Sequence, residues 1–343
     1  MAEEAVEPEP RTEAELRTAA ELIVDVCFEV KEGEVVTIIT DNRRKEEAEM
    51  VATVVAERGG WPVVANNDTQ IRRALEDTLF PMVPPRNLHT AIVSSDDIII
   101  MTNLEWANRF AHVPAVKEAC ANHSRIGSVE EGFGRWPISV EDIRRTISNA
   151  QAAIKLLEGK KRVRVTSPAG TNVEVSIEGR PALEVVPVKA KGAMMGPVPL
   201  WGEVAYGAVE TETEGTIVVD GNLLGVGVPG NVEHPVTWHV EDGRYTAIEG
   251  DWEAERLRSV ISGVPGTEVV AEFAFGTSDF APKVGPSSKG RKGTAHFALG
   301  DNQNCYPGGQ NKSALHLDGV NLDISIQILD TGEYIVKDGI WQL

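Results

Sequence analysis

The pattern of strands and helices changes near residue 160, and this change limits the possible folds more than any other feature of the chain. Before it, short apolar runs alternate with amphipathic segments. We expect strands at 34–39, 61–65 and 97–101 and near residue 126, and helices from Leu16 to Val24 and at 43–57, 69–79, 114–121 and 139–157. Strands that alternate with helices form a parallel sheet with both faces covered.

After residue 160 the chain reads as strand following strand. Lys161–Thr166 and Thr171–Ile177 flank the turn Ser167-Pro-Ala-Gly170, and Asp242-Gly243 between two alternating runs is a strong hairpin signal. Further strands are expected at 216–220, near 268–275, 294–299, 315–318, 322–328 and 334–336, with one helix at 252–262. The sequence therefore predicts an α/β plus α+β protein. Residues 1–10 form a flexible tail, 11–159 an N-terminal parallel-sheet α/β domain, and 160–343 a β-rich α+β domain.

Acidic residues outnumber basic ones, which argues against two classes of partner. The 343 residues include 33 Lys and Arg and 52 Asp and Glu, a net charge of −19. Such a surface repels nucleic acid and anionic membranes. No apolar run approaches the ~20 residues of a membrane helix. The first 15 residues lack the pattern of a secretory signal, and three dispersed cysteines favour a reducing compartment. We expect a cytoplasmic protein without nucleic-acid or membrane partners.

Two glycine-rich segments come close to phosphate-binding motifs. Gly225–Gly230 has the spacing G-x-G-x-x-G, but a strand rather than a helix follows it, so a glycine-rich turn is the better interpretation. Gly285–Gly290 has P-loop glycine spacing without the Lys-Ser/Thr pair that must follow. The basic run from Lys289 to Lys292 could bind a substrate carboxylate, but a solvated loop is the preferred interpretation.

Candidate metal ligands lie instead on the strands of the second half. His316 and Asp318 are two positions apart, so on a strand their side chains share one face while Leu317 takes the other. His296 alternates with Phe297 in the same way, and Glu272 alternates with Phe273. A carboxylate inside so apolar a strand requires a cation if its face is internal. Glu203 also lies among apolar residues and glycines.

Carboxylates together with imidazoles suit Zn, Mn, Co or Fe. Five such groups suffice for two metals that share a carboxylate, and three suffice for one metal with open positions. The sequence leaves both counts open.

These segments resemble a known family. Gly293-Thr-Ala-His-Phe-Ala-Leu-Gly-Asp-Asn302, Gly308-Gly309 and His316-Leu-Asp318 are similar to the signature of the M29 metallo-aminopeptidases, the thermophilic aminopeptidase T group. Ser167–Asn172, Gly202-Glu203 and Glu272 ahead of Phe275-Gly276-Thr277 match in the same order, so that the resemblance covers most of 160–330. It implies an N-terminal α/β domain, a C-terminal metal-binding domain and a homodimer. The metal ligands that it implies are Glu203, Glu272, His296, His316 and Asp318.

The chain departs from that family at one ligand. The family's peptidases have a Tyr shortly after the counterpart of His296, whereas this chain has Gln303 near that place and Tyr306 slightly later. The superfamily also resembles ring-cleaving 2,5-dihydroxypyridine dioxygenases that use one Fe(II), and an aromatic-amine hydrolase. In the dioxygenases a His stands at the position of Glu272 and the counterpart of His296 is missing. The presence of Glu272 and His296 therefore favours the hydrolytic branch.

The leading interpretation is a metal-dependent hydrolase of the aminopeptidase type that acts on a small molecule or short peptide. One or two divalent ions would activate water to cleave an N-terminal residue or a small amide or aromatic-amine C–N bond. Glu272, through an oxygen not bound to metal, or Asp301 would serve as the general base. The first alternative is a mononuclear Fe(II) ring-cleaving dioxygenase. The second is a binding protein that keeps the fold with a degraded site.

Overall fold

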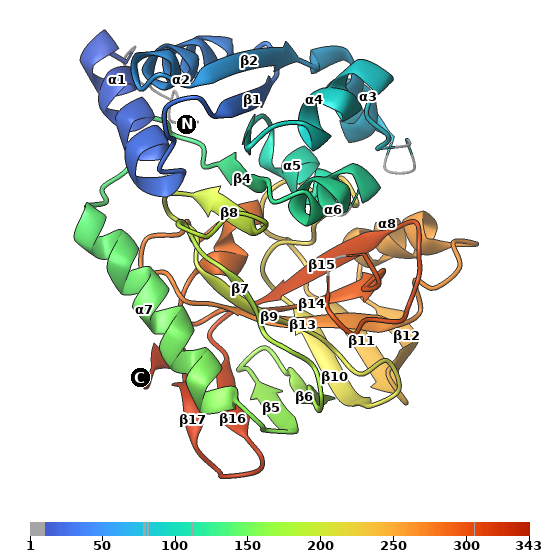
Figure 1. Ribbon diagram of the computed structural model, residues 1–343. Coiled ribbons are helices and arrows are strands. Elements are labelled where there is room, and N and C mark those ends of the chain that lie inside the picture. Colours follow the sequence, from blue (N-terminus) through green and yellow to red (C-terminus); the bar gives the residue numbers. More distant parts are fainter. Residues whose placement is uncertain (1–10, 78–79, 81, 112, 305) are drawn as a thin grey trace, which may run out of the picture.

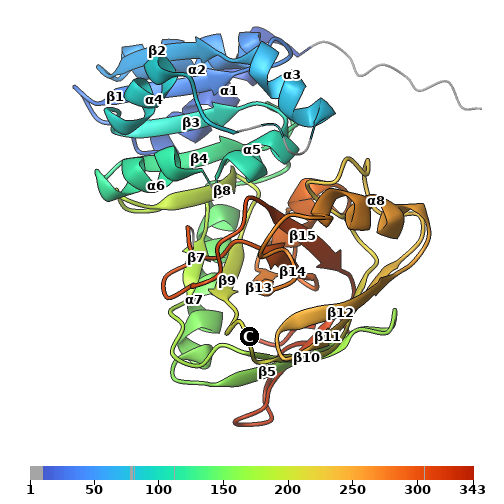
Figure 2. The ribbon, with the colours of Figure 1, turned by 90° about the vertical axis from the view of Figure 1, so that its right-hand side faces the viewer.

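The computed structural model describes residues 11–343 except 78–79, 81, 112 and 305, so the tail expected at 1–10 lies outside the described residues. The chain forms three sheets. Figures 1 and 2 show the first sheet with its helices at one end of the molecule and the two other sheets at the opposite end. The fold is the expected combination of a parallel-sheet α/β region and a β-rich α+β region.

The first sheet is parallel throughout. Its strand order is β2 (Trp61–Asn66), β1 (Val35–Thr40), β3 (Asp97–Met101), β4 (Arg125–Val129) and β8 (Met194–Val198). All five residues of β3 are buried, as its continuous apolar run predicts. Its alternate side chains enter different cores: Ile99 and Met101 lie in one apolar cluster, and Ile98 and Ile100 lie in another.

Helices cover both faces of this sheet. One cluster includes residues of α1 (Glu13–Glu21), the π-helical η1 (Leu22–Cys27) and α2 (Lys45–Glu57). The other includes residues of α3 (Asp68–Glu76), α4 (Arg86–Val93), α5 (Leu104–Phe110) and α6 (Pro114–Ala121). Thr12 caps α1 in the capping box that its sequence suggests. The long helix α7 (Val140–Leu157) then leads to the second half of the chain.

The chain returns once to the first sheet. Strand β8 follows β5, β6 and β7 in the sequence, yet it pairs parallel to β4 at the edge of the N-terminal sheet. A short apolar segment that contains Gly196 and Pro197 gives little strand signal, and the sequence did not predict it. The domain boundary near residue 160 stays a prediction, and β8 links the two halves.

The second half contains two antiparallel sheets. One has the order β12 (Arg244–Glu249), β11 (Val236–Glu241), β10 (Thr213–Val219), β6 (Asn172–Ser176), β5 (Arg162–Thr166), β16 (Ser325–Ile328), β17 (Tyr334–Lys337) and β18 (Ile340–Trp341). The other, here called the site sheet, has the order β15 (His316–Asn321), β14 (Ala295–Gly300), β13 (Val270–Gly276), β9 (Glu203–Gly207) and β7 (Leu183–Val185). The helix α8 (Trp252–Ile261) and the short 3-10 helix η2 (Pro286–Gly290) complete this half.

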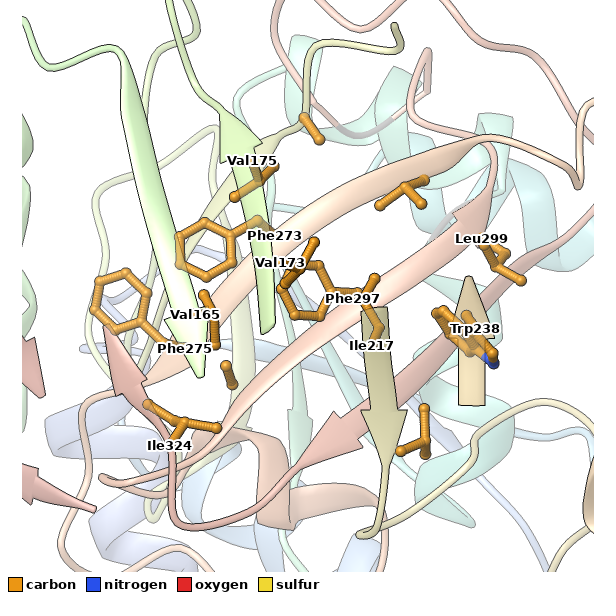
Figure 3. Packing of buried hydrophobic residues seen from close by; sticks show 14 of the residues in the cluster. Val165, Val173, Val175, Ile217, Trp238, Phe273, Phe275, Phe297, Leu299 and Ile324 are labelled. Carbon is orange, nitrogen blue, oxygen red and sulfur yellow. The ribbon is translucent and has the colours of Figure 1, made fainter. Parts of the chain in front are cut away.

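The main core lies between these two sheets. Figure 3 shows Phe273, Phe275, Phe297 and Leu299 of the site sheet packed with residues of the eight-stranded sheet, among them Val165, Val173, Val175, Ile217 and Trp238. Phe273 lies 5.7 Å from Phe297 between ring centroids. Since successive side chains on a strand point to opposite faces, this packing fixes which residues of the site sheet face the other way.

No helix among the described residues is both long enough and apolar enough to span a membrane.

The two sheets approach closely at Gly319 of β15. A Cβ atom at this position would collide with the side chain of Val219 and would lie 2.8 Å from the ring of Trp238. We expect Gly319→Ala to lower the free energy of unfolding by about 1–3 kcal/mol, because an extra methyl group in a packed core forces its neighbours to shift. Chemical denaturation measures this change. An unfolding midpoint equal to that of the unchanged protein would contradict the packing described here.

Glu130, directly after β4, is buried in the first half, and its carboxylate forms no ion pair with any described residue. Its Oε1 accepts a hydrogen bond from the Glu131 amide at 3.0 Å, whereas Oε2 has no hydrogen-bond partner. The guanidinium of Arg44 bonds the backbone oxygens of Val129 and Glu130 instead. Burial raises the pKa of Glu130 from 4.5 to about 7.

This shift predicts a pH dependence of stability. Between pH 4.5 and about 7 the folded protein retains a proton at Glu130 that the unfolded chain releases, so its contribution to stability is lost as the pH rises through that window. Glu130→Gln removes the effect. Between pH 4.5 and pH 8 we expect the free energy of unfolding to fall by about 2 kcal/mol less in this variant than in the unchanged protein. Urea denaturation across this range tests the prediction, and parallel pH profiles would contradict it.

Candidate metal centre

Four neighbouring strands of the site sheet bring the five predicted ligands to one face. In the register of the sheet, Glu203 lies opposite Gly276, Ala274 opposite His296, and Ala298 opposite both Glu272 and Asp318. Between the ligands, small residues such as Ala205, Ala274 and Ala298 keep this face open. All five ligand candidates are buried: Glu203, Glu272, His296, His316 and Asp318. The alternation with apolar residues correctly predicted that His316 and Asp318 share a face and that Glu272 and His296 point away from the neighbouring phenylalanines. The register of the sheet adds Glu203 to the same face.

Glu272 lies at the middle of the group. Its Oε1 is 3.3 Å from His296 Nε2, and its Oε2 is 2.9 Å from His316 Nε2. His316 Nε2 is also 3.1 Å from Asp318 Oδ1, and Glu203 Oε2 is 3.7 Å from His296 Nε2. The ligand atoms form two overlapping sets that share Glu272: Glu203, Glu272 and His296 in one, and Glu272, His316 and Asp318 in the other. Each set is compact enough to hold one ion.

Several of these atoms lack hydrogen-bond partners although they are buried. They are Glu203 Oε2, both ring nitrogens of His296, and Asp318 Oδ1. A buried polar atom without a partner is costly, and a bound cation removes the cost for each acceptor facing it. The donor set fits a divalent metal such as iron, and the assignment of the five residues as ligands stays a prediction.

The two histidines differ in what holds them. His316 Nδ1 lies 2.6 Å from the backbone oxygen of Asp301, so Nδ1–H donates to this carbonyl and Nε2 faces the carboxylates of the centre. Metal-binding histidines almost always have such a second hydrogen bond. His296 Nδ1 has none. The set that contains His316 is therefore the better prepared for an ion.

Asp301 has this supporting position rather than that of a general base. Its Oδ1 accepts from the amide of Ser313 at 3.3 Å and its Oδ2 from the amide of Asn304 at 3.1 Å. These bonds fix the loop from which the Asp301 carbonyl reaches His316. The sequence placed Asp301 near the ligands but could not show that its backbone makes the contact.

Protons take the place of a cation when none is bound. Burial raises the pKa of Glu203 to about 7. Burial alone would lower the pKa of His316, but the neighbouring carboxylates of Asp318 and Glu272 raise it to about 10. Burial opposes ionisation of Glu272 as well, yet the neighbouring imidazoles hold the pKa of this carboxyl well below its usual range. The centre thus keeps its acidic groups neutralised, and a divalent ion can replace the protons.

Lys289 belongs to the centre, so the interpretation of its segment as a solvated loop was wrong for this residue. Its side chain is buried, and Nζ donates to Asp318 Oδ2 at 2.6 Å. Burial alone would lower the pKa of Lys289, but the nearby carboxylates, Asp318 first, raise it. The turn at η2 positions Lys289, and a short turn has no periodicity from which the direction of a side chain can be predicted.

Asn108 is the second residue that the sequence did not indicate. It comes from α5, in the first half of the chain, and its Nδ2 donates to Asp318 Oδ2 at 3.1 Å. Its Oδ1 accepts from Lys289 Nζ at 2.8 Å. The centre is therefore completed by both halves of the chain, through a contact between residues 210 positions apart.

A cavity lies next to the centre. Glu203, Glu272, Lys289 and Asn108 line it at the polar end. Its apolar walls include Leu104, Ala107, Leu183, Val185, Met194, Met195 and Trp201. Tyr306 also lines the cavity and stacks on His316, with 5.9 Å between ring centroids. Apolar walls with a few polar groups at one end are typical of a small-molecule site.

Comparison with known proteins identifies the family. The family model of 2,5-dihydroxypyridine 5,6-dioxygenase (NicX) matches residues 18–342, so the chain belongs to this family. The fold is similar to that of 2,5-dihydroxypyridine dioxygenase from Pseudomonas putida KT2440, with a TM-score of 0.74, 19% identity, and coverage of 97% of this chain and 98% of that one. AmpT from Thermus thermophilus is also similar, with a TM-score of 0.67, 16% identity, and coverage of 96% and 99%. No curated protein sequence gives a significant match.

The family match overturns the leading functional interpretation. The chain belongs to a family of enzymes, but the hydrolase, aminopeptidase and metalloprotease assignment was wrong, and the M29 family is not confirmed. At 16% identity the similarity to AmpT shows a shared fold. Glu272 and His296 favoured the hydrolytic branch because the dioxygenases were expected to have His at the first position and to lack the second. The dioxygenase family matches this chain although it has both residues, so this expected difference does not separate the two branches.

The difference between the two histidines gives a test of the ligand set. We expect His316→Ala to weaken divalent-ion binding at least about 100-fold, because it removes a ligand whose orientation is fixed. We expect the matched variant His296→Ala to weaken binding by about 10-fold or less. Titration with Mn²⁺ or anaerobic Fe²⁺, followed by calorimetry, measures both affinities. Equal losses in the two variants, or full metal content in His316→Ala, would contradict this assignment.

Proposed function

We propose that the protein is an iron-dependent dioxygenase that opens a hydroxylated pyridine ring, with 2,5-dihydroxypyridine as the first candidate substrate. The observation that carries the proposal is the match of the dioxygenase family to residues 18–342, nearly the whole chain. The centre and its cavity supply the chemical requirements: ligands for one divalent ion and an apolar space beside them.

The ion would be held by Glu272, His316 and Asp318. His316 is oriented by the carbonyl of Asp301, and Asp318 directs Oδ1 toward His316 Nε2 because Lys289 and Asn108 bond its other oxygen. A set of imidazole and carboxylate ligands with open positions is the kind of site that Fe(II) oxygenases use. Bound iron supplies the redox chemistry by which dioxygen reacts with an aromatic ring.

The protein's own residues bind and orient the ring. Trp201, Leu104 and Met195 offer flat or flexible apolar surfaces against which an aromatic ring can pack. The cavity walls exclude water from the ring, while Glu272 connects the cavity to the ligand set. Glu203 also lines the cavity, next to His296 and Glu272, and would accept a hydrogen bond from a ring substituent.

Oxygen consumption tests the proposal. We expect protein loaded with Fe²⁺ under anaerobic conditions to take up one molecule of dioxygen per molecule of 2,5-dihydroxypyridine, with loss of the aromatic ultraviolet band. The product should be heavier than the substrate by the mass of one dioxygen molecule, and both atoms should carry label from ¹⁸O₂. Removal of the ion by a chelator should stop the reaction, and Asp318→Asn should lower kcat by at least about 100-fold.

Zinc-loaded protein serves as the matched control, because Zn²⁺ has no redox chemistry. Dioxygen uptake that requires iron and ring substrate together supports the proposal. An iron-loaded protein with full metal content that leaves a panel of hydroxylated pyridines unchanged would contradict it.

A further inference from the structure

The metal centre contains a cation of its own. Glu203, Glu272 and Asp318 bring three carboxylates together, and the ammonium of Lys289, 2.6 Å from Asp318 Oδ2, offsets one of their charges. One divalent ion then leaves the centre without net charge. Without Lys289 the loaded centre would be negative and would repel an anionic ligand in a space where water screens little. Lys289 therefore makes the loaded centre able to accept an anion.

One N–H group of the Lys289 ammonium is available to a ligand. Of its three N–H groups, one bonds Asp318 Oδ2 at 2.6 Å and one bonds Asn108 Oδ1 at 2.8 Å. Within the part of the chain that the structure describes, the third makes no hydrogen bond. The ammonium lies 5.5 Å from the ring centroid of Trp201, and both residues line the cavity. Among the described residues lining this cavity, Lys289 is the one Lys or Arg.

Its position is fixed by neighbours on both halves of the chain. Asn108 holds the ammonium from α5, and Gly290 brings the following backbone so close to Trp201 that a Cβ there would lie 2.9 Å from the indole. The cation is thus oriented before a ligand arrives, and a pre-oriented donor binds without the entropy loss of ordering a long side chain.

We propose that Lys289 binds the ionised ring hydroxyl of the substrate and so selects hydroxylated rings over rings without this group. The proposal rests on the proposed function, since it names the residue that recognises the ring. A single free N–H suits one oxygen atom, whereas a carboxylate presents two oxygens and needs two donors for full pairing. The apolar walls next to Trp201 accommodate the remainder of the ring. Lys289 is thus a specificity-determining residue that also fixes the orientation of the ring against Glu272.

Binding measurements without turnover test the proposal. The iron-loaded protein, kept anaerobic, is titrated with 3-hydroxypyridine, with pyridine and with pyridine-3-carboxylate, and the affinities are followed by ultraviolet difference spectra and calorimetry. The unchanged protein should prefer 3-hydroxypyridine to pyridine, and the bound ligand should show the absorption of the ionised hydroxyl. In Lys289→Met this preference should fall by roughly 10- to 100-fold, the usual loss for one hydrogen bond to a charged group, while pyridine binds as before.

Lys292→Met is the matched control, because Lys292 lies in the same basic run and pairs with Asp279 on the surface. It should leave all three affinities unchanged. Iron content is measured for each variant under saturating metal, so that a loss of metal is seen directly.

Each other outcome has a definite meaning. An equal loss of affinity for 3-hydroxypyridine and pyridine in Lys289→Met would show that Lys289 only supports Asp318. An unchanged preference for 3-hydroxypyridine over pyridine would show that Lys289 does not contact the ring. Either result would overturn the proposal and leave the proposed function standing. A preference for pyridine-3-carboxylate that Lys289→Met abolishes would overturn the choice of hydroxyl. Failure of the unchanged, iron-loaded protein to bind any of the rings would overturn the proposed function together with this inference.

Discussion

Three buried carboxylates that face one another require positive charge, and the structure around the centre follows from this requirement. Glu203, Glu272 and Asp318 are withdrawn from water on one face of the site sheet. Lys289 supplies one positive charge, and without a metal the protonation of His316 and Glu203 supplies the remaining neutralisation. A divalent ion held by Glu272, His316 and Asp318 would replace the proton of His316.

The same strands connect this centre to the hydrophobic core. Phe273, Phe297 and Leu317 bury one face of the site sheet against the eight-stranded sheet, and Glu272, His296 and Asp318 alternate with them on the other face. A shift of one residue in register would exchange the two sets, so the apolar packing fixes the ligand geometry. The first half of the chain completes the site from outside this sheet, through Asn108 and the cavity wall that includes β8.

The extent to which the sequence predicted this arrangement depended on the range of the interactions. Strand alternation is local, so the common face of Glu203, Glu272, His296, His316 and Asp318 could be predicted, as could the change of fold class near residue 160. Lys289 lies on a short turn and Asn108 on a helix that the sequence did not indicate, and both reach Asp318 through long-range contacts. The weakly patterned β8 was missed for the same reason, since only its pairing with β4 makes it a strand. The reaction class was mistaken because ligand types alone are compatible with both hydrolysis and oxygen chemistry.

The most direct measurement of the central claim is anomalous X-ray diffraction at the iron absorption edge, from crystals of the protein loaded with Fe²⁺ without oxygen. The account predicts one strong peak per chain, within bonding distance of Glu272, His316 and Asp318, with Lys289 still beside Asp318. A peak at a different place, two peaks of equal height in the centre, or no peak in fully loaded crystals would contradict it.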